Sequence, residues 1–165
     1  MQVIVDSREQ NPFWTGRFCF KTALNVGDYT TYELLNKFHV ERKSLVDLYG
    51  TITKGNVRFK KEILRAKHAG IRLEVVIEGT KKDFKDKKFY GGAERLVSGE
   101  TLIKIINTIQ RNHNLIVHWC KDRESARKKT KRLLKQNEKR NKKSNPKKIK
   151  TGNRGLQAKA RNSYR

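Results

Sequence analysis

Short strand-like runs, separated by segments of helical periodicity, constrain the fold of this chain most. The strand-like runs cover residues 2–6, 29–32, 38–43, 71–77 and 115–119. Segments with apolar residues on one helical face, or basic helix-forming composition, cover residues 56–69, 100–111 and 122–136. This alternation predicts an α/β domain in three layers, with a mixed sheet in the middle and flanking helices.

Residues 18–43 are expected to form a meander of paired strands. Gly27 and Asp28 follow one extended stretch, and Glu41, Arg42 and Lys43 end the strand that begins at residue 38. Residues 29–32 are a further β-prone run, and residues 33–37 are a candidate hairpin connection from this run to the strand that begins at residue 38. The meander would bring Asp28 and Glu41 side by side on paired strands.

An acidic pair next to a lysine is the combination that metal-assisted phosphodiester cleavage requires. The carboxylates of Asp28 and Glu41 can hold a hard divalent cation, Mg²⁺ or Mn²⁺. Such a cation polarises a phosphoryl oxygen and acidifies a bound water. Lys43 would place a positive charge beside the attacking water or the developing phosphorane. Because side chains alternate along a strand, Glu41 and Lys43 face a cleft while Arg42 points to the other side.

Several of these residues also have a plainer interpretation. A Gly–Asp pair is common in turns, and an acid two residues before a lysine is often a solvated strand face. The combination of Asp28, Glu41 and Lys43 favours the metal site over both. Asp47 is as well explained as the ion-pair partner of Arg42 as by a catalytic role.

Three further residues are candidates for the same site. Asp6 ends a strand, which is a frequent site position in open α/β sheets, although a capping role is the alternative. Arg8 and Arg58 are candidates for phosphate contacts because guanidinium groups match phosphate oxygens in bidentate fashion. Their alternative is an ordinary surface salt bridge.

Four segments in this order resemble the nuclease domain of the XPF-type structure-specific endonucleases. They are Val5–Glu9, Val26–Tyr29, Val40–Ser44 with Asp47 and Leu48, and Gly55–Phe59, and residues 76–79 are similar to the family's next core strand. The similarity spans roughly residues 2–135. It implies a restriction-endonuclease-like fold and incision of branched, flapped or distorted DNA to leave a 5′ phosphate.

The resemblance also implies roles for individual residues. Asp28 and Glu41 would be metal ligands, assisted by the carbonyl of Arg42, and Lys43 would be the catalytic lysine. The residues expected to line the same cleft are Asp6, Arg8, Asp47 and Arg58. The tandem helix-hairpin-helix module of eukaryotic members is not expected after residue 136, because apolar periodicity is missing there.

The basic residues are concentrated at the end of the chain. The net charge is +24, and residues 121–165 contribute +16 of it, from 19 basic and 3 acidic residues. We therefore expect a nuclease domain over residues 1–136 and a disordered basic tail over residues 137–165 that binds phosphates without sequence preference.

A lysine-rich segment over residues 80–92 is a further candidate for nucleic-acid binding. It is expected to be a loop in which lysines neutralise phosphates while Phe84, Phe89 and Tyr90 stack on unpaired bases. A solvated loop with anchoring aromatics is the alternative. Its candidate phosphate-binding residues are Lys81, Lys82, Lys85, Lys87 and Lys88.

Two functional hypotheses follow from the sequence. The first is a metal-dependent endodeoxyribonuclease. The alternative is a non-catalytic nucleic-acid-binding module, or a scaffold for a partner nuclease, and RNA is a third possibility for the substrate. Pairing with a second copy or a partner subunit is left open. We expect an intracellular protein with two free thiols, Cys19 and Cys120, since no signal peptide or membrane-length apolar run is evident.

Overall fold

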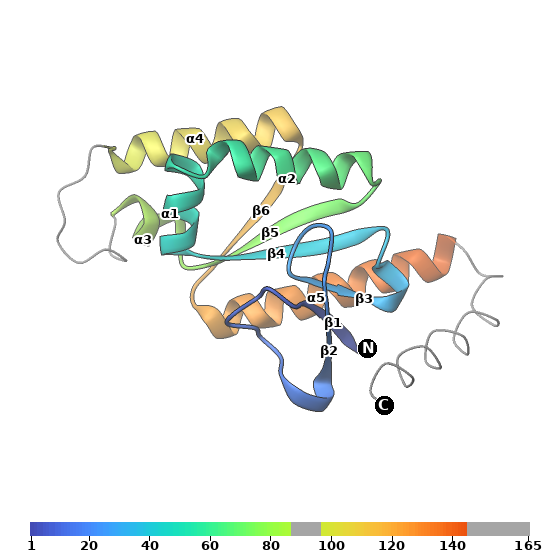
Figure 1. The fold of residues 1–165 in the computed structure, drawn as a ribbon. Helices are drawn as coiled ribbons and strands as arrows, with labels where there is room; N and C mark the ends of the chain where they lie inside the picture. Colours follow the sequence, from blue (N-terminus) through green and yellow to red (C-terminus); the bar gives the residue numbers. More distant parts are fainter. Residues whose placement is uncertain (87–96, 145–165) are drawn as a thin grey trace.

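The computed structural model describes residues 1–86 and 97–144. A six-stranded mixed sheet forms its centre, in the order β2-β1-β3-β4-β5-β6 (Figure 1). The strands are β1 (Val3–Asp6), β2 (Cys19–Thr22), β3 (Tyr29–Thr31), β4 (Phe38–Ser44), β5 (Arg72–Glu78) and β6 (Ile116–Cys120). The predicted α/β class with flanking helices is confirmed.

The expected meander of residues 18–43 is formed only in part, because β1 separates β2 from β3. Strand β3 is antiparallel to both β1 and β4, while β4, β5 and β6 run parallel to one another. Strand β1 lies between β2 and β3 and pairs with β2 in parallel. The reason is burial: all four residues of β1 are buried, which suits a central strand, whereas β2 is partly exposed and forms an edge.

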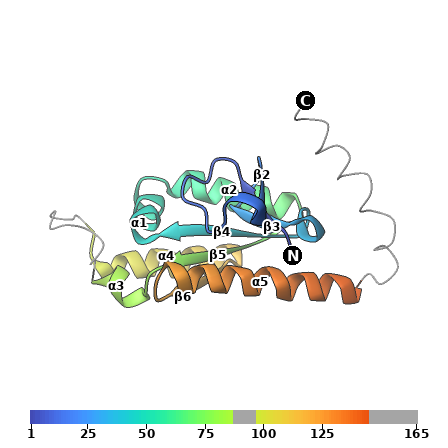
Figure 2. The same cartoon turned by 90° about the horizontal axis from the view of Figure 1, so that it is seen from below.

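Helices cover the two faces of the sheet unequally. The helices are α1 (Leu45–Thr53), α2 (Asn56–His68), α3 (Lys81–Lys85), α4 (Gly99–His113) and α5 (Arg123–Ser144), with short 3-10 turns η1 (Gly16–Phe18) and η2 (Tyr32–Leu34). Helices α1 and α2 lie on one side of β4, and α5 runs along the other side (Figure 2).

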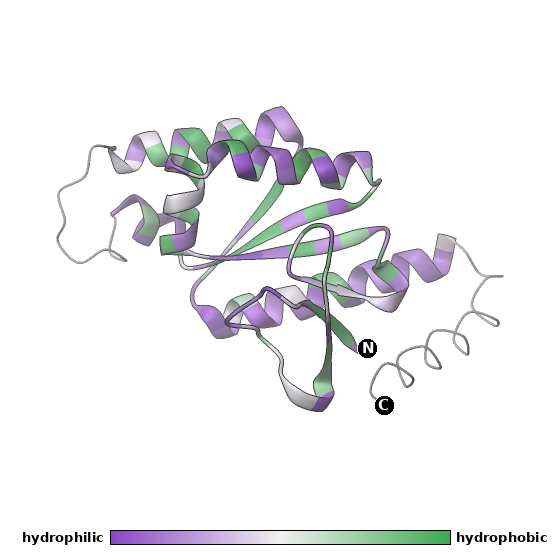
Figure 3. Ribbon diagram, viewed as in Figure 1, coloured by the Kyte–Doolittle hydropathy of each residue, from purple (hydrophilic) through white to green (hydrophobic). Residues whose placement is uncertain are grey.

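Strand β5 shows how the core is divided. Val75 and Ile77 pack with residues of α1, α2, α3 and α4, whereas Val76 packs with Leu133 and Leu134 of α5. This follows from the alternation of side chains along a strand. The helices accordingly carry alternating hydrophobic and hydrophilic bands (Figure 3).

Part of the lysine-rich segment is helical and not a loop. Thr80 caps α3, since its hydroxyl accepts a hydrogen bond from the Asp83 backbone N–H. Phe84 is fully buried and lies 5.7 Å from the ring of Trp119. The expectation that Phe84 stacks on bases is therefore wrong, because its ring is part of the core. Lys87, Lys88, Phe89 and Tyr90 lie outside the described residues.

Helix α5 also extends beyond its expected end. It continues to Ser144, into the segment expected to be tail. Polar contacts hold this extension: the Asn137 side chain accepts from Arg72, and Asn141 Nδ2 donates to the Glu33 carbonyl at 2.8 Å. Residues 145–165 lie outside the described residues. Among residues 1–86 and 97–144, none of the helices combines the length and the apolar character needed to cross a membrane.

Candidate active site

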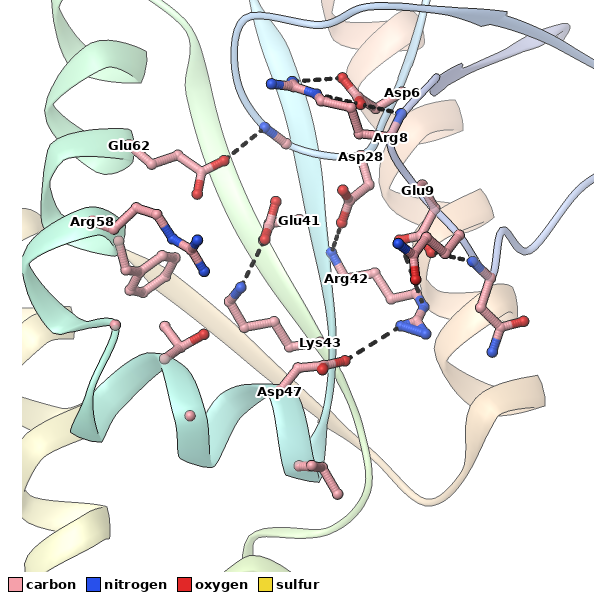
Figure 4. Close-up of a pocket in the computed structure, with 18 of the residues that line it drawn as sticks. Asp6, Arg8, Glu9, Asp28, Glu41, Arg42, Lys43, Asp47, Arg58 and Glu62 are labelled. Atoms are coloured by element: carbon pink, nitrogen blue, oxygen red, sulfur yellow. Dashed lines mark hydrogen bonds and ion pairs between the residues drawn. The ribbon is translucent and has the colours of Figure 1, made fainter.

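A groove of about 1130 Å³ opens between α1, α2 and the ends of β1, β3 and β4 (Figure 4). All but a few of its lining side chains are polar or charged. The lining includes every residue expected there from the sequence, namely Asp6, Arg8, Asp28, Glu41, Arg42, Lys43, Asp47 and Arg58.

The turn before β3 places Asp28 beside β4. Gly27 has φ +67°, and a Cβ there would lie 3.1 Å from both His39 Cβ and Leu73 Cδ1. Glycine is thus required for both backbone conformation and space. The Asp28 N–H donates to the Val40 carbonyl at 2.9 Å, and Asp28 Oδ2 accepts from the Arg42 N–H at 2.7 Å. The predicted proximity of this aspartate to the Glu41 strand is confirmed.

Glu41 and Lys43 project from β4 to the same side, as the alternation predicted (Figure 4). Lys43 Nζ lies 2.8 Å from Glu41 Oε1 and 5.0 Å from the ring centroid of Phe59 in α2. Both charged side chains are about nine-tenths buried. The pair is therefore held in a fixed geometry at the floor of the groove.

Burial and the charges of neighbouring acids raise the pKa of both Asp28 and Glu41. Burial and the neighbouring Glu41 raise the pKa of Asp28 to about 9. Burial also raises the pKa of Glu41, although Lys43 partly opposes this. For Lys43, burial lowers the pKa, but attraction to Glu41 outweighs it and the net shift is upward. Lys43 consequently stays charged near neutral pH and is unsuited to act as a general base.

Arg42 points to the opposite face of β4 and pairs with acids there. Its Nε lies 3.2 Å from Glu78 Oε1, whereas the ion pair with Asp47 is longer, at 4.0 Å. The Asp47 side chain is 60% exposed and completes a capping box with Ser44 at the start of α1. The expected Arg42–Asp47 pair thus exists, but Glu78 is the closer partner.

Asp6 acts in the structure as an anchor for the loops around it. Its carboxylate accepts three hydrogen bonds from Arg8, each of 2.8 Å, and one from the Leu24 N–H at 2.7 Å. Burial alone would raise the pKa of Asp6, but these bonds lower it overall. With its oxygens so engaged, Asp6 fixes Arg8, whose side chain is 71% exposed at the groove.

Helix α2 supplies a carboxylate that the sequence did not single out. Arg58, Glu62 and Arg65 line the groove from one side of α2. Glu62 Oε1 accepts a hydrogen bond from the Gly27 N–H at 3.2 Å, and its charge raises the pKa of Glu41. The sequence did carry a signal for Glu62. Arg58, Glu62 and Arg65 are four and three residues apart, which places them on one side of a helix, next to the core residues Phe59 and Ile63.

The described lysines of the lysine-rich segment lie outside this groove. Lys81, Lys82 and Lys85 are exposed on α3. Lys82 pairs with Asp86 at 2.6 Å and Lys85 with Glu100 at 3.0 Å. They border a separate shallow hollow between α3 and α4. These three lysines therefore do not contribute to the lining of the acidic groove.

The available metal donors are few. Within residues 1–86 and 97–144, no three His, Cys, Asp or Glu side chains are arranged so that they could jointly hold a metal ion. The half-buried carboxylate of Asp28 and the buried carboxylate of Glu41 remain as a pair. A pair is compatible with Mg²⁺, which proteins commonly bind through one or two carboxylates with water and substrate phosphate as the other ligands.

Comparisons with known proteins agree with the fold and with the sequence motifs. Residues 5–133 match the model of the ERCC4 domain. XPF from Aeropyrum pernix is similar in structure, with a TM-score of 0.61, 18% sequence identity and coverage of 82% of this chain and 66% of that one. XPF from Aeropyrum pernix in complex with DNA has a TM-score of 0.61 and 18% sequence identity, with coverage of 84% of this chain and 66% of that one. The chain thus spans just under two thirds of the length of these two XPF chains. A search of curated proteins found no match.

Proposed function

The chain belongs to the ERCC4 domain family, and from this membership and the geometry of the acidic groove we propose that it is a divalent-metal-dependent endodeoxyribonuclease. It would hydrolyse phosphodiester bonds in branched, flapped or distorted DNA. The observation that carries the proposal is the convergence of Asp28, Glu41 and Lys43 on one open groove. The DNA preference is supported by family membership and by the net charge of +24.

The donor set fits a divalent cation. Burial and neighbouring acids raise the pKa of both carboxyls, Glu41 acting on Asp28 and Glu62 on Glu41, so negative charge is undercompensated there. A divalent cation between them would remove this imbalance. The carbonyl of Arg42 is a further candidate ligand: its N–H already donates to Asp28, and the N–H and C=O of one strand residue point to the same edge.

Each residue of the groove has a distinct part in this proposal. Asp28 and Glu41 would hold Mg²⁺ or Mn²⁺, which when bound supplies Lewis acidity toward the phosphate and an acidified water. Lys43, kept charged by Glu41, would stabilise negative charge on the attacking water or on the phosphorane. Arg8 and Arg58, both exposed at the groove, would hold flanking phosphates.

Cleavage of a labelled DNA fork or flap in Mg²⁺ or Mn²⁺ tests the proposal. We expect cleavage by the wild type and a loss of at least about 100-fold in Asp28→Asn, Glu41→Gln and Lys43→Met, with binding retained. Lys21→Met and Glu33→Gln remove exposed charges outside the groove and should cleave normally. Binding without metal-dependent products in the wild type would reject the nuclease function.

That last result would favour the alternative, a non-catalytic nucleic-acid-binding module or a scaffold for a partner nuclease. The same panel with the labelled strand replaced by RNA separates a DNA substrate from an RNA substrate. Size-exclusion chromatography with light scattering tests pairing with a second copy.

A further inference from the structure

Helix α5 carries a strongly basic surface that the proposed active site does not use. The helix contains eleven Lys and Arg against two Glu. Its buried residues, Ala126, Thr130, Leu133, Leu134 and Asn137, form one stripe against the sheet. At 100° per residue, the opposite side of the helix presents a second stripe. We call it the basic stripe; it consists of Lys128, Lys131, Arg132, Lys135 and Lys139.

The basic stripe is poorly compensated by acids. Lys128 lies 3.7 Å from Glu124. No carboxylate among the described residues forms an ion pair with the other four members, Lys131, Arg132, Lys135 and Lys139. Three pairs within the stripe are like charges four residues apart, an arrangement that destabilises a helix. Solvent-facing helix surfaces ordinarily mix both signs, so helix stability does not account for this composition.

Its position separates the stripe from the acidic groove. The groove is lined from α1 and α2, while α5 lies on the opposite face of the sheet (Figure 2). A strand bound beside Asp28 and Glu41 is therefore on the other side of the molecule from Lys135. The stripe can serve only a separate part of a substrate, or a separate ligand.

From this arrangement we propose that the basic stripe of α5 is a second DNA-binding surface, which holds a duplex arm of the substrate other than the one cut in the groove. The inference rests on the proposed DNA substrate. The stripe is about 16 Å long, which suffices to face several phosphates of one strand. It includes no apolar side chain, so a phosphate backbone suits it better than a membrane or an apolar protein surface.

Equilibrium binding of a fluorescent DNA fork, measured without divalent metal over a series of salt concentrations, tests the surface. The full chain is compared with a variant lacking four unpaired charges of the stripe. Removing about four phosphate contacts should lower the slope of log affinity against log salt by about 3. The four substitutions are Lys131→Gln, Arg132→Gln, Lys135→Gln and Lys139→Gln.

A matched control removes the same charge elsewhere. Its four lysines are exposed on α2 and α4 and do not line the acidic groove. Its slope should change by less than about 1. Equal losses in both variants, or no loss in the stripe variant, would overturn the proposal. The control substitutions are Lys60→Gln, Lys61→Gln, Lys67→Gln and Lys104→Gln.

Two further measurements make the result unambiguous. A two-site variant, Lys135→Gln with Lys139→Gln, should lose about half as much slope, and an intact fold is checked by circular dichroism. In cleavage assays the stripe variant should raise KM for the fork and leave kcat unchanged; a fall in kcat alone would count against a remote arm-binding surface. Because binding is measured without metal, a failure of the proposed hydrolysis leaves the test of the stripe intact.

Discussion

At the scale of single residues, the proton affinity of Asp28 has a direct consequence for stability. Its folded pKa of about 9 lies well above the usual value of about 3.9 in an unfolded chain. Between these pH values the folded state holds a proton that the unfolded state lacks, so this residue's contribution to stability is lost as pH rises.

Asp28→Asn should therefore stabilise the metal-free protein. Asparagine retains an acceptor for the Arg42 N–H and carries no charge. We expect a gain of roughly 1–3 kcal/mol at about pH 8, several degrees in Tm, that disappears below about pH 4. Thermal unfolding over a pH series measures it, with the exposed Glu33→Gln as control. A variant less stable than wild type at high pH would contradict the prediction.

Glu62 allows charge and hydrogen bonding to be separated. Glu62→Gln keeps an acceptor for the Gly27 N–H but removes the charge that raises the pKa of Glu41. The Glu41 carboxyl signal in carbon NMR should then titrate at lower pH. In Glu62→Leu the Gly27 N–H also loses its acceptor. The Mg²⁺ affinity of this variant should therefore be about tenfold lower than that of Glu62→Gln. Equal affinities in the two variants would show that Glu62 does not position Asp28.

Sequence patterns predicted some site residues better than others. Glu41 and Lys43 followed from strand alternation, because both lie on one strand and no distant element decides their direction. Glu62 and Glu78 were not recognised as partners, since their contacts with Gly27 and Arg42 depend on how α2 and β5 pack against β4. Only tertiary structure brings these groups together.

At the scale of secondary structure, two helices begin at serines, a residue type that favours the cap position. The hydroxyls of Ser44 and Ser98 accept hydrogen bonds from the Asp47 N–H and the Thr101 N–H. Asn56, also of a type that favours caps, is instead the first residue of α2, and its side chain donates to the Ile52 carbonyl of α1 at 3.3 Å. Helix α3 was missed although Thr80 and Asp83 offered a capping pattern, because five residues give no periodicity.

The contact between α3 and α4 yields a prediction with a close control. A Cβ on Gly99 would lie 2.0 Å from the Lys85 carbonyl oxygen, so Gly99→Ala must push the two helices apart. We expect a loss of about 1–3 kcal/mol. Gly50→Ala in α1 meets nothing within 4 Å and should gain about 0.5–1 kcal/mol. Urea unfolding measures both; a neutral Gly99→Ala would contradict the close packing of α3 and α4.

At the scale of the whole molecule, one carboxylate connects β4 to the helix on the opposite face. Glu78 Oε1 lies 3.2 Å from Arg42 Nε and 2.6 Å from Arg123 Nη1 of α5. Arg123 Nη2 also donates to the Asn11 and Pro12 carbonyls. The sequence predicted both layers of helices and the order of the strands in the chain. It did not predict this link, which joins residues 45 positions apart.

The link predicts that Glu78 affects the candidate active site as well as stability. Glu78→Gln removes the negative charge that pairs with Arg42 and Arg123, and should lower the free energy of unfolding by about 2–4 kcal/mol. Because Arg42 donates its N–H to Asp28, we also expect weaker Mg²⁺ binding, by about tenfold in calorimetry under folded conditions.

Glu74 provides the matched control. It is similarly buried on β5 and pairs with His118 at 2.7 Å and Arg72 at 3.4 Å, outside the groove lining. Glu74→Gln should therefore destabilise the fold and leave Mg²⁺ affinity unchanged. If both variants weakened Mg²⁺ binding equally, the effect of Glu78 would be one of global stability. A difference confined to Glu78 would mean that α5, through Arg123, helps to fix the geometry of the strand that carries Glu41 and Lys43.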